Sequence, residues 1–131
     1  MTHAEATVLF DRRRLAWLAA DLDAYLACWA DDMSFQSPTQ AEPLRGRAAF
    51  ADLVRRSLAL ARPVRFDVLA LAVDGRVVLA EWVIAVERRS DGRRVEWHGM
   101  SVAEFDGGLI RRWREYWNPA DLTGGAPAAT A

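Results

Sequence analysis

One acidic residue stands among tryptophans near the C-terminal end of the sequence. Glu115 lies between Trp113 and Trp117 in the run WREYW. In an extended strand alternate side chains share a face, so the carboxyl group and both indoles should point the same way. A carboxyl group enclosed by indole rings loses hydration, which raises its pKa towards the range useful for general acid–base catalysis. Glu115 is therefore the candidate catalytic residue, and the structural alternative is a buried ion pair with Arg13 or Arg14.

Further candidate residues share the predicted inner face of the strands. The aromatic side chains could stack on a flat hydrophobic ligand. For any one of them core filling is the favoured interpretation, but the set as a whole is expected to leave a cavity beside Gly99. Ser37 and Ser101 could donate hydrogen bonds to a ligand oxygen or bond only to their strand neighbours. The ligand-binding residues predicted in this way are Phe35, Ser37, Trp82, Ile84, Trp97, Gly99, Ser101, Trp113 and Trp117.

The sequence carries few residues suited to metal binding. Cys28 is the one cysteine, and His3 and His98 are the two histidines. Zinc and iron sites need three or four convergent ligands, so we expect no metal site and no cofactor. Asp31 and Asp32 resemble a catalytic dyad, but we expect them in the turn after a helix, bonded to the local backbone. His98 is expected on the outer face of the sheet.

Apolar spacing in the first half of the chain predicts three helices. The first runs from about Ala4–Leu18, and the third lies between Gly46 and Pro63, which punctuate its ends. The second helix is predicted from apolar residues at i, i+3, i+4 and i+7, which are Leu22, Tyr25, Leu26 and Trp29. Asp21, just before them, is a plausible N-cap. A short strand, Met33–Ser37, is expected before the third helix.

The second half of the chain is typical of strands. Aspartate-glycine turns, a strong hairpin signal, occur at Asp74–Gly75, Asp91–Gly92 and Asp106–Gly108. They separate four runs rich in β-forming residues: Val64–Val73, Arg76–Arg88, Arg93–Phe105 and Leu109–Trp117. These runs predict an antiparallel meander whose long strands should curl or carry bulges.

The predicted turns also set which residues face each other on neighbouring strands. A loop at residues 89–92 would pair Trp82 with Gly99 and Ile84 with Trp97. A three-residue turn after Phe105 would pair Ser101 with Trp113, Gly99 with Glu115, and Trp97 with Trp117. Gly99 would then lie between Trp82 and Glu115, and its missing side chain would leave space there.

The expected fold is of the α+β class: a cone-shaped, curved antiparallel sheet wrapped around the three N-terminal helices. Such a cone would leave a pocket at its open end. Residues 1–122 would form one domain and residues 123–131 a flexible tail. The outer face of the sheet is apolar enough to predict a homodimer, through Met100, Val102, Ile110 and Tyr116.

Composition narrows the possible partners. The 131 residues carry 17 basic and 18 acidic side chains, a net charge of −1, so no nucleic-acid-binding surface is predicted. No apolar run approaches the roughly 20 residues of a membrane span, and no signal-peptide core begins the sequence. A cytoplasmic location is therefore expected. All the basic residues are arginine, a bias that suggests a GC-rich bacterial genome.

Two segments together resemble a known superfamily. They are ADDMSFQSP at residues 30–38, followed by Gly46 and a helix, and FDGGLIRRWREYW at residues 105–117, which ends the meander. The pattern resembles the NTF2-like (cystatin-like) superfamily and, within it, the SnoaL-like branch of ketosteroid isomerases, limonene-epoxide hydrolases and polyketide cyclases. The resemblance covers about Asp11 to Leu122. It implies the fold more strongly than any one activity, because this fold carries many chemistries.

The known catalytic residues of these relatives are mostly absent. The base aspartate of the isomerases falls at Ser37, their oxyanion-binding acid at Ser101 and their first-helix tyrosine near Arg13, so that chemistry is not expected. The epoxide hydrolases end in Trp-Arg-Asp-Tyr-Phe, which residues 113–117 match with Glu115 in place of aspartate. Their remaining polar residues would fall at Trp82, Ile84, Phe35 and Ser37, so their mechanism does not carry over intact.

Three functions remain open. The chain could be a cofactor-free isomerase, cyclase or hydrolase of a small hydrophobic substrate, terpenoid or polycyclic, with Glu115 as the general acid or base. It could instead bind such a molecule without catalysis. The third alternative is a dimerisation module whose cone is filled by its own side chains.

Overall fold

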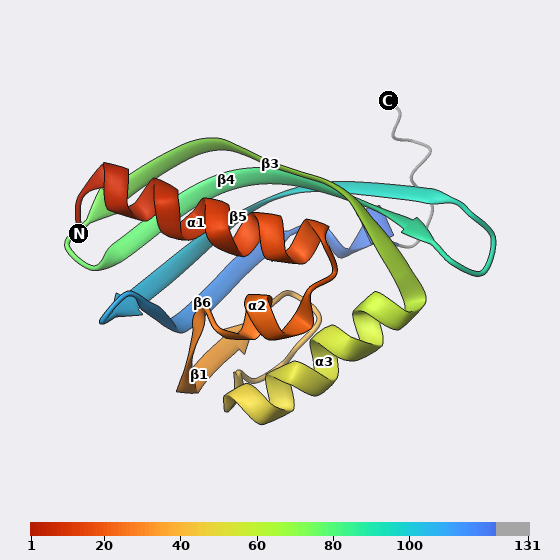
Figure 1. Cartoon of the computed structure of the whole chain (residues 1–131). Coiled ribbons are helices and arrows are strands. Elements are labelled where there is room, and N and C mark those ends of the chain that lie inside the picture. Colours follow the sequence, from red (N-terminus) through yellow and green to blue (C-terminus); the bar gives the residue numbers. More distant parts are fainter. Residues whose placement is uncertain (123–131) are drawn as a thin grey trace.

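Three helices lie on one side of a six-stranded sheet in the computed structural model, which describes residues 1–122 (Figure 1). The helices are α1 (His3–Leu18), α2 (Leu22–Leu26) and α3 (Arg47–Leu60), and a short 3-10 helix, η1 (Pro119–Leu122), follows the last strand. The strands are β1 (Trp29–Gln36), β2 (Leu44–Arg45), β3 (Ala61–Asp74), β4 (Val77–Arg88), β5 (Arg94–Asp106) and β6 (Leu109–Trp117). The α+β fold is confirmed, and the predicted tail, residues 123–131, lies outside the described residues.

The helix starts follow from capping residues. Thr2 and Glu5 form a capping box at α1, each side chain accepting the other's backbone N–H, at 3.0 and 2.8 Å. Asp21 caps α2, as predicted, by accepting from the backbone N–H of Ala24 at 3.1 Å. Gly46 precedes α3 with φ 92°, a conformation that favours glycine. No helix within residues 1–122 is both long enough and apolar enough to cross a membrane.

The second helix is shorter than predicted because β1 begins at Trp29. Pairing of Trp29 with β6 places this residue in the sheet, so tertiary pairing overrides its helical spacing. The predicted turn at Asp31 and Asp32 is therefore wrong. Both residues lie within β1, where Asp31 forms an ion pair with Arg47 and Asp32 one with Arg111.

The strand order is β2-β1-β6-β5-β4-β3. The meander predicted from the turns is confirmed, since β3, β4, β5 and β6 pair antiparallel in succession. The sheet as a whole is mixed, because β1 runs parallel to β6. This parallel pair joins the N-terminal half of the chain to the last strand and brings the ends of β1 and β6 together.

The register is confirmed between β4 and β5 but wrong between β5 and β6. Trp82 faces Gly99 and Ile84 faces Trp97, as predicted. Across the next turn, however, Gly99 faces Trp117, Ser101 faces Glu115 and Ala103 faces Trp113. Asp106 pairs with Leu109, so the turn holds two residues rather than three, and a bulge follows within β6. The shorter turn and the bulge each move the register by one residue. Every pair is therefore shifted by two residues, and the same side chains stay on the inner face.

The same bulge overturns one prediction for the outer face. Ile110 pairs with Phe105 before the irregularity and is buried rather than exposed. His98, Met100 and Tyr116 are exposed on the outer face, as expected, and Val102 is half-buried.

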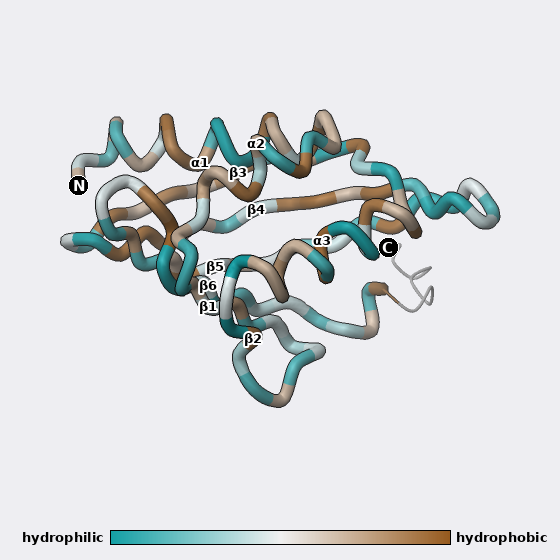
Figure 2. The backbone as a smooth tube through the Cα atoms, turned by 60° about the horizontal axis from the view of Figure 1, so that its bottom comes forward, coloured by the Kyte–Doolittle hydropathy of each residue, from teal (hydrophilic) through white to brown (hydrophobic). Residues whose placement is uncertain are grey.

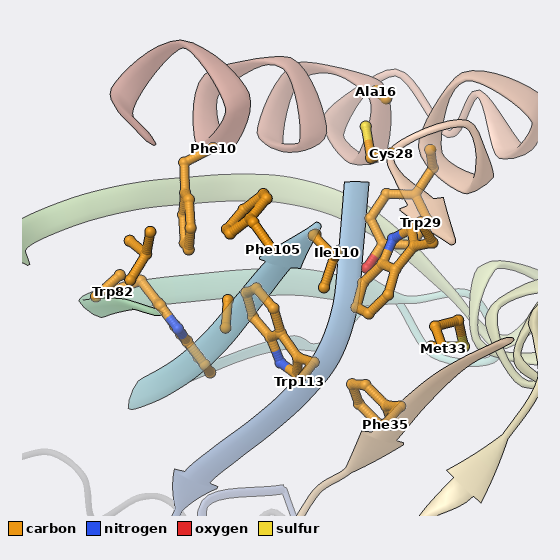
Figure 3. Packing of buried hydrophobic residues seen from close by; sticks show 14 of the residues in the cluster. Phe10, Ala16, Cys28, Trp29, Met33, Phe35, Trp82, Phe105, Ile110 and Trp113 are labelled. Atoms are coloured by element: carbon orange, nitrogen blue, oxygen red, sulfur yellow. The ribbon is translucent and has the colours of Figure 1, made fainter. Parts of the chain in front are cut away.

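Aromatic rings fill the space between α1 and the sheet. Figure 3 shows Trp113 between Phe10 of α1 and Trp29 of β1, and the ring centroids of these two pairs lie 5.7 and 5.6 Å apart. Trp29, Trp82 and Trp113 are almost completely buried. Hydrophilic residues gather at the projecting turn between β4 and β5 (Figure 2). Much of the interior of the cone is therefore occupied by the protein's own side chains.

Candidate functional site

The carboxyl group of Glu115 is held between two indoles. Trp113 Nε1 donates to one of its oxygens at 2.8 Å, and Trp117 Nε1 donates to the other at 2.7 Å. These three residues alternate along β6, so the prediction that they share a face is confirmed. A carboxylate has about four lone-pair positions, and the indoles occupy two of them. The remaining positions are free to accept a proton or a hydrogen bond.

Burial raises the pKa of Glu115 above its ordinary value. The two indole N–H groups and the positive charge of Arg13 act in the opposite direction, because they favour the ionised form. The effect of burial is the larger, so the acid keeps its proton at a higher pH than an exposed glutamate. Such a group can donate or accept a proton nearer neutral pH.

The raised pKa predicts a pH-dependent contribution to stability. Between the pKa of an unfolded-chain glutamate, about 4.3, and the higher folded value, the folded state binds more protons than the unfolded state. The free energy of unfolding contributed by Glu115 is therefore largest below that window and is lost as pH rises through the folded pKa. Urea unfolding of the wild type and Glu115→Gln across pH should show this decline only in the wild type. Parallel curves for the two proteins would contradict it.

Glu115 lines a pocket of about 500 Å³ where β1 and β6 end. The other lining residues come from the two strand ends and the loop after β1: Gln36, Ser37, Pro38, Gln40, Arg114, Tyr116 and Trp117. Ser37 is buried, and its hydroxyl lies 3.0 Å from the hydroxyl of Thr39, so it is engaged locally. Of the predicted site residues, the structure brings Glu115, Ser37 and Trp117 together around this pocket.

The other predicted residues belong to the core or to the sheet next to it. Trp82 donates from Nε1 to the hydroxyl of Ser101 at 3.2 Å, and both residues are fully buried. Gly99 does not open space beside Glu115. A Cβ on Gly99 would lie 2.5 Å from Trp82 Cη2, so the missing side chain makes room for that indole. Seven predicted residues line neither this pocket nor the second hollow, which lies between α1 and β3: Phe35, Trp82, Ile84, Trp97, Gly99, Ser101 and Trp113.

A second hollow, of about 550 Å³, lies between α1 and β3. Its walls include Thr7 and Arg14 from the helix and Leu69 from the strand, and none of the predicted site residues lines it. Among residues 1–122, no group of three or more histidine, cysteine, aspartate or glutamate side chains is placed to hold a metal ion.

The structural alternative for Glu115, an ion pair with Arg13 or Arg14, is not formed. Arg14 bonds instead to Asp11 at 2.9 Å and to the carbonyl oxygen of Phe66 at 3.0 Å. Arg13 is buried, with 4% of its surface exposed, and its guanidinium carbon lies 4.0 Å from the ring centroid of Trp113. Arg13 therefore acts on Glu115 through its charge, and both residues interact with Trp113.

Comparison with known proteins places this fold in a family. Residues 11–113 match the SnoaL-like domain. The chain belongs to the SnoaL-like family. This SnoaL-like domain is 26% identical to an LEH-like epoxide hydrolase from M. tuberculosis, with a TM-score of 0.78 over 91% of this chain and 82% of that one. No curated protein matches the sequence.

Two further solved structures share the fold of the SnoaL-like domain. A provisionally named isomerase from Bacillus subtilis is 21% identical, with a TM-score of 0.83 over 93% of each chain. A provisionally named polyketide cyclase from Xanthomonas campestris is 25% identical, with a TM-score of 0.77 over 90% of this chain and 93% of that one. The predicted assignment to the SnoaL-like branch of the NTF2-like superfamily is confirmed.

Two parts of the site in this SnoaL-like domain escaped the sequence analysis. Gln36 and Gln40 reach the pocket because β1 pairs in parallel with β6. The two strands lie about 80 residues apart in the chain, and no turn signal in the sequence indicates that they pair. The position of Arg13 among aromatic rings was also missed. The available signal was the spacing of Phe10, Arg13 and Ala16, which lie three residues apart and so share one face of α1.

Proposed function

We propose that this SnoaL-like domain binds a small hydrophobic molecule in the pocket at the ends of β1 and β6, and that Glu115 transfers a proton to or from it. The observation that carries the proposal is the carboxyl group of Glu115, fixed by two indole N–H groups at the wall of that pocket. A fixed carboxyl group with a raised pKa suits general acid–base catalysis. The substrate class is a terpenoid or polycyclic compound, and the reaction is a cofactor-free isomerisation, cyclisation or hydrolysis.

The similarity to an LEH-like epoxide hydrolase supports proton-transfer chemistry at this position. The relay expected from that resemblance is incomplete, because its other positions are occupied by Phe35, Ser37, Trp82 and Ile84. These side chains are buried, and three of them cannot exchange a proton. Glu115 would therefore work alone, with the indoles fixing its orientation.

Binding without catalysis is the second candidate, and one observation favours it. Each oxygen of Glu115 already accepts an indole N–H, and the hydroxyls of Ser37 and Ser101 are engaged with Thr39 and Trp82. In that case Glu115 serves to hold the two tryptophans, and the pocket retains a ligand without changing it.

Tryptophan emission tests whether the pocket binds such molecules. Titration with terpenoids, steroids and aromatic polyketides should give saturable quenching for at least one class, because Trp117 forms part of the pocket wall. Trp117→Phe should reduce the quenching. Trp17→Phe, which removes an indole packed on Phe66 away from the pocket, should leave it unchanged. Absence of quenching by every compound would contradict the proposal.

We also infer that the domain forms a homodimer through the outer face of the sheet. Leu79, Met100 and Tyr116 are 37%, 47% and 57% exposed, and Met100 lies opposite Tyr116 in the paired strands. An apolar stripe across β4, β5 and β6 is expected to be covered by a second copy. A cytoplasmic location and a bacterial source stay predictions.

Sedimentation velocity at micromolar concentration should show the dimer. Met100→Glu should yield a monomer, because the introduced carboxylates would have to be buried in the interface. Leu69→Glu, a similar change on the exposed part of β3, should leave the dimer intact. A monomeric wild type would overturn the inference.

A further inference from the structure

Among residues 1–122, no carboxylate forms an ion pair with the guanidinium group of Arg13. The residue is 4% exposed, and neither Nε nor Nη1 has a hydrogen-bond partner among residues 1–122. The guanidinium group is a cation that offers N–H donors and no acceptor. Burial of a charge without a full set of hydrogen bonds is strongly unfavourable. A group of this kind is expected to serve a purpose that offsets the cost.

Four aromatic rings surround the charge. The guanidinium carbon lies 4.0 Å from the ring centroid of Trp113, 5.3 Å from that of Phe66, 5.5 Å from that of Tyr25 and 5.9 Å from that of Trp29. The ring faces stabilise a cation, and the hydroxyl of Tyr25 is hydrogen-bonded to Arg13, but Nε and Nη1 have no acceptor. We call these four rings and Arg13 the arginine cage.

The cage holds a further unsatisfied donor. Trp29 Nε1 is buried and also has no partner among the described residues. Three nitrogen donors, Nε and Nη1 of Arg13 and Nε1 of Trp29, are thus buried in one region, and none of them has an acceptor among the described residues. An acceptor that carries negative charge would satisfy the donors and the charge together.

Glu115 is the acidic group whose charge acts on this cage. Trp113 connects the two, because its ring lies over Arg13 while its Nε1 donates to Glu115. The other titratable groups near Arg13 are Tyr25 on α2 and Cys28 after it, and burial raises the pKa of both, so they stay neutral. The region is therefore balanced when Glu115 is ionised and carries an excess positive charge when Glu115 is protonated.

We propose that the arginine cage binds the carboxylate of the ligand, so that the substrate class is hydrophobic carboxylic acids. The inference rests on the proposed function, because the apolar part of the ligand would occupy the pocket beside Glu115. The carboxylate would accept from Arg13 and from Trp29 Nε1. Trp113 would have to move aside to admit it. Glu115 would then take up a proton, since the ligand replaces it as the counter-charge of Arg13.

A matched acid and amide test this inference. The probes are 1-naphthoate and 1-naphthamide, which share the ring system and differ in charge. In protein labelled with ¹⁵N, the indole N–H resonances of Trp29 and Trp113 should shift with naphthoate. Naphthoate should bind at least about tenfold more tightly than the amide, the equivalent of one hydrogen bond to a charged group. Its affinity should rise as pH falls towards the pKa of Glu115, and Glu115→Gln should remove that dependence.

Variants of α1 provide the control. Arg13→Met fills a similar volume without charge, and it should abolish the preference for the acid while the amide still binds. Arg12→Met removes an exposed arginine one residue away and should keep the preference. Thermal unfolding establishes that each variant is folded. If Arg13→Met does not fold, the acid–amide comparison and the indole shifts of the wild type decide the question.

The outcomes separate this inference from the proposed function. Equal binding of acid and amide, or binding of neutral compounds alone, would overturn the carboxylate site and leave the hydrophobic pocket standing. Unchanged preference for the acid in a folded Arg13→Met protein would also overturn it. If neither probe and no compound of the wider panel bound, both the carboxylate site and the proposed function would be wrong.

Discussion

Replacement of Trp113 by alanine is expected to lower the free energy of unfolding by about 3 to 5 kcal/mol, the cost of removing a large aromatic side chain from a core. Trp113 is completely buried and packs on Phe10, Trp29 and the guanidinium of Arg13. Its removal would also leave Arg13 without its closest ring and Glu115 without one donor. Urea unfolding, extrapolated linearly to water, measures the change.

Two related variants separate packing from hydrogen bonding. Trp117→Ala removes the same kind of indole donor to Glu115 but from a half-buried residue, so its cost should be clearly smaller. Trp113→Phe keeps an aromatic ring over Arg13 and loses the N–H, which should cost about 1.5 to 3 kcal/mol for a hydrogen bond to a charged acceptor. Equal losses in Trp113→Ala and Trp117→Ala would show that Trp113 is not the centre of the core.

Glu115→Gln is expected to reduce turnover of a bound substrate about 100-fold to 10,000-fold, the usual contribution of a general acid or base. The amide has nearly the shape of the acid but cannot transfer its proton in the same way. The substitution should lower kcat more than it changes KM, because it removes a transition-state interaction and keeps the pocket. Steady-state kinetics with a compound identified by tryptophan quenching provides the measurement.

The control variants account for the structural role of Glu115. Glutamine presents one acceptor and one donor to two indole N–H groups, so some stability will be lost and the folded fraction must be measured. Glu115→Asp keeps the carboxyl group but shortens the side chain by one methylene group, so an intermediate rate is expected. Glu96→Gln changes an exposed glutamate on the outer face of β5 and should leave the rate unchanged. Full activity in Glu115→Gln would support binding without catalysis.

Most elements of this fold could be predicted from local patterns, but β2 and the start of β1 could not. Asp21 and Gly46 mark the starts of α2 and α3, and aspartate-glycine turns separate the long strands. Alternation along β6 placed Glu115 with Trp113 and Trp117. The inner face of β6 was predicted correctly although the turn length was wrong. The shorter turn and the bulge in β6 each shift the pairing by one residue, so the same side chains stay on that face. The predicted pairs between β5 and β6 were wrong, so Gly99 was placed opposite Glu115 when it lies opposite Trp117.

The pocket depends on contacts between distant segments, which local patterns do not encode. The sequence alone determined the class of fold and the acid that shares a face with two indoles, because both follow from residue spacing within single elements. Tertiary structure decided that Trp82 fills the space beside Gly99, that Gln36 and Gln40 reach the pocket, and that Arg13 is enclosed by aromatic rings. These outcomes depend on how side chains from separate elements share the same volume, and that is settled only when the helices pack on the sheet.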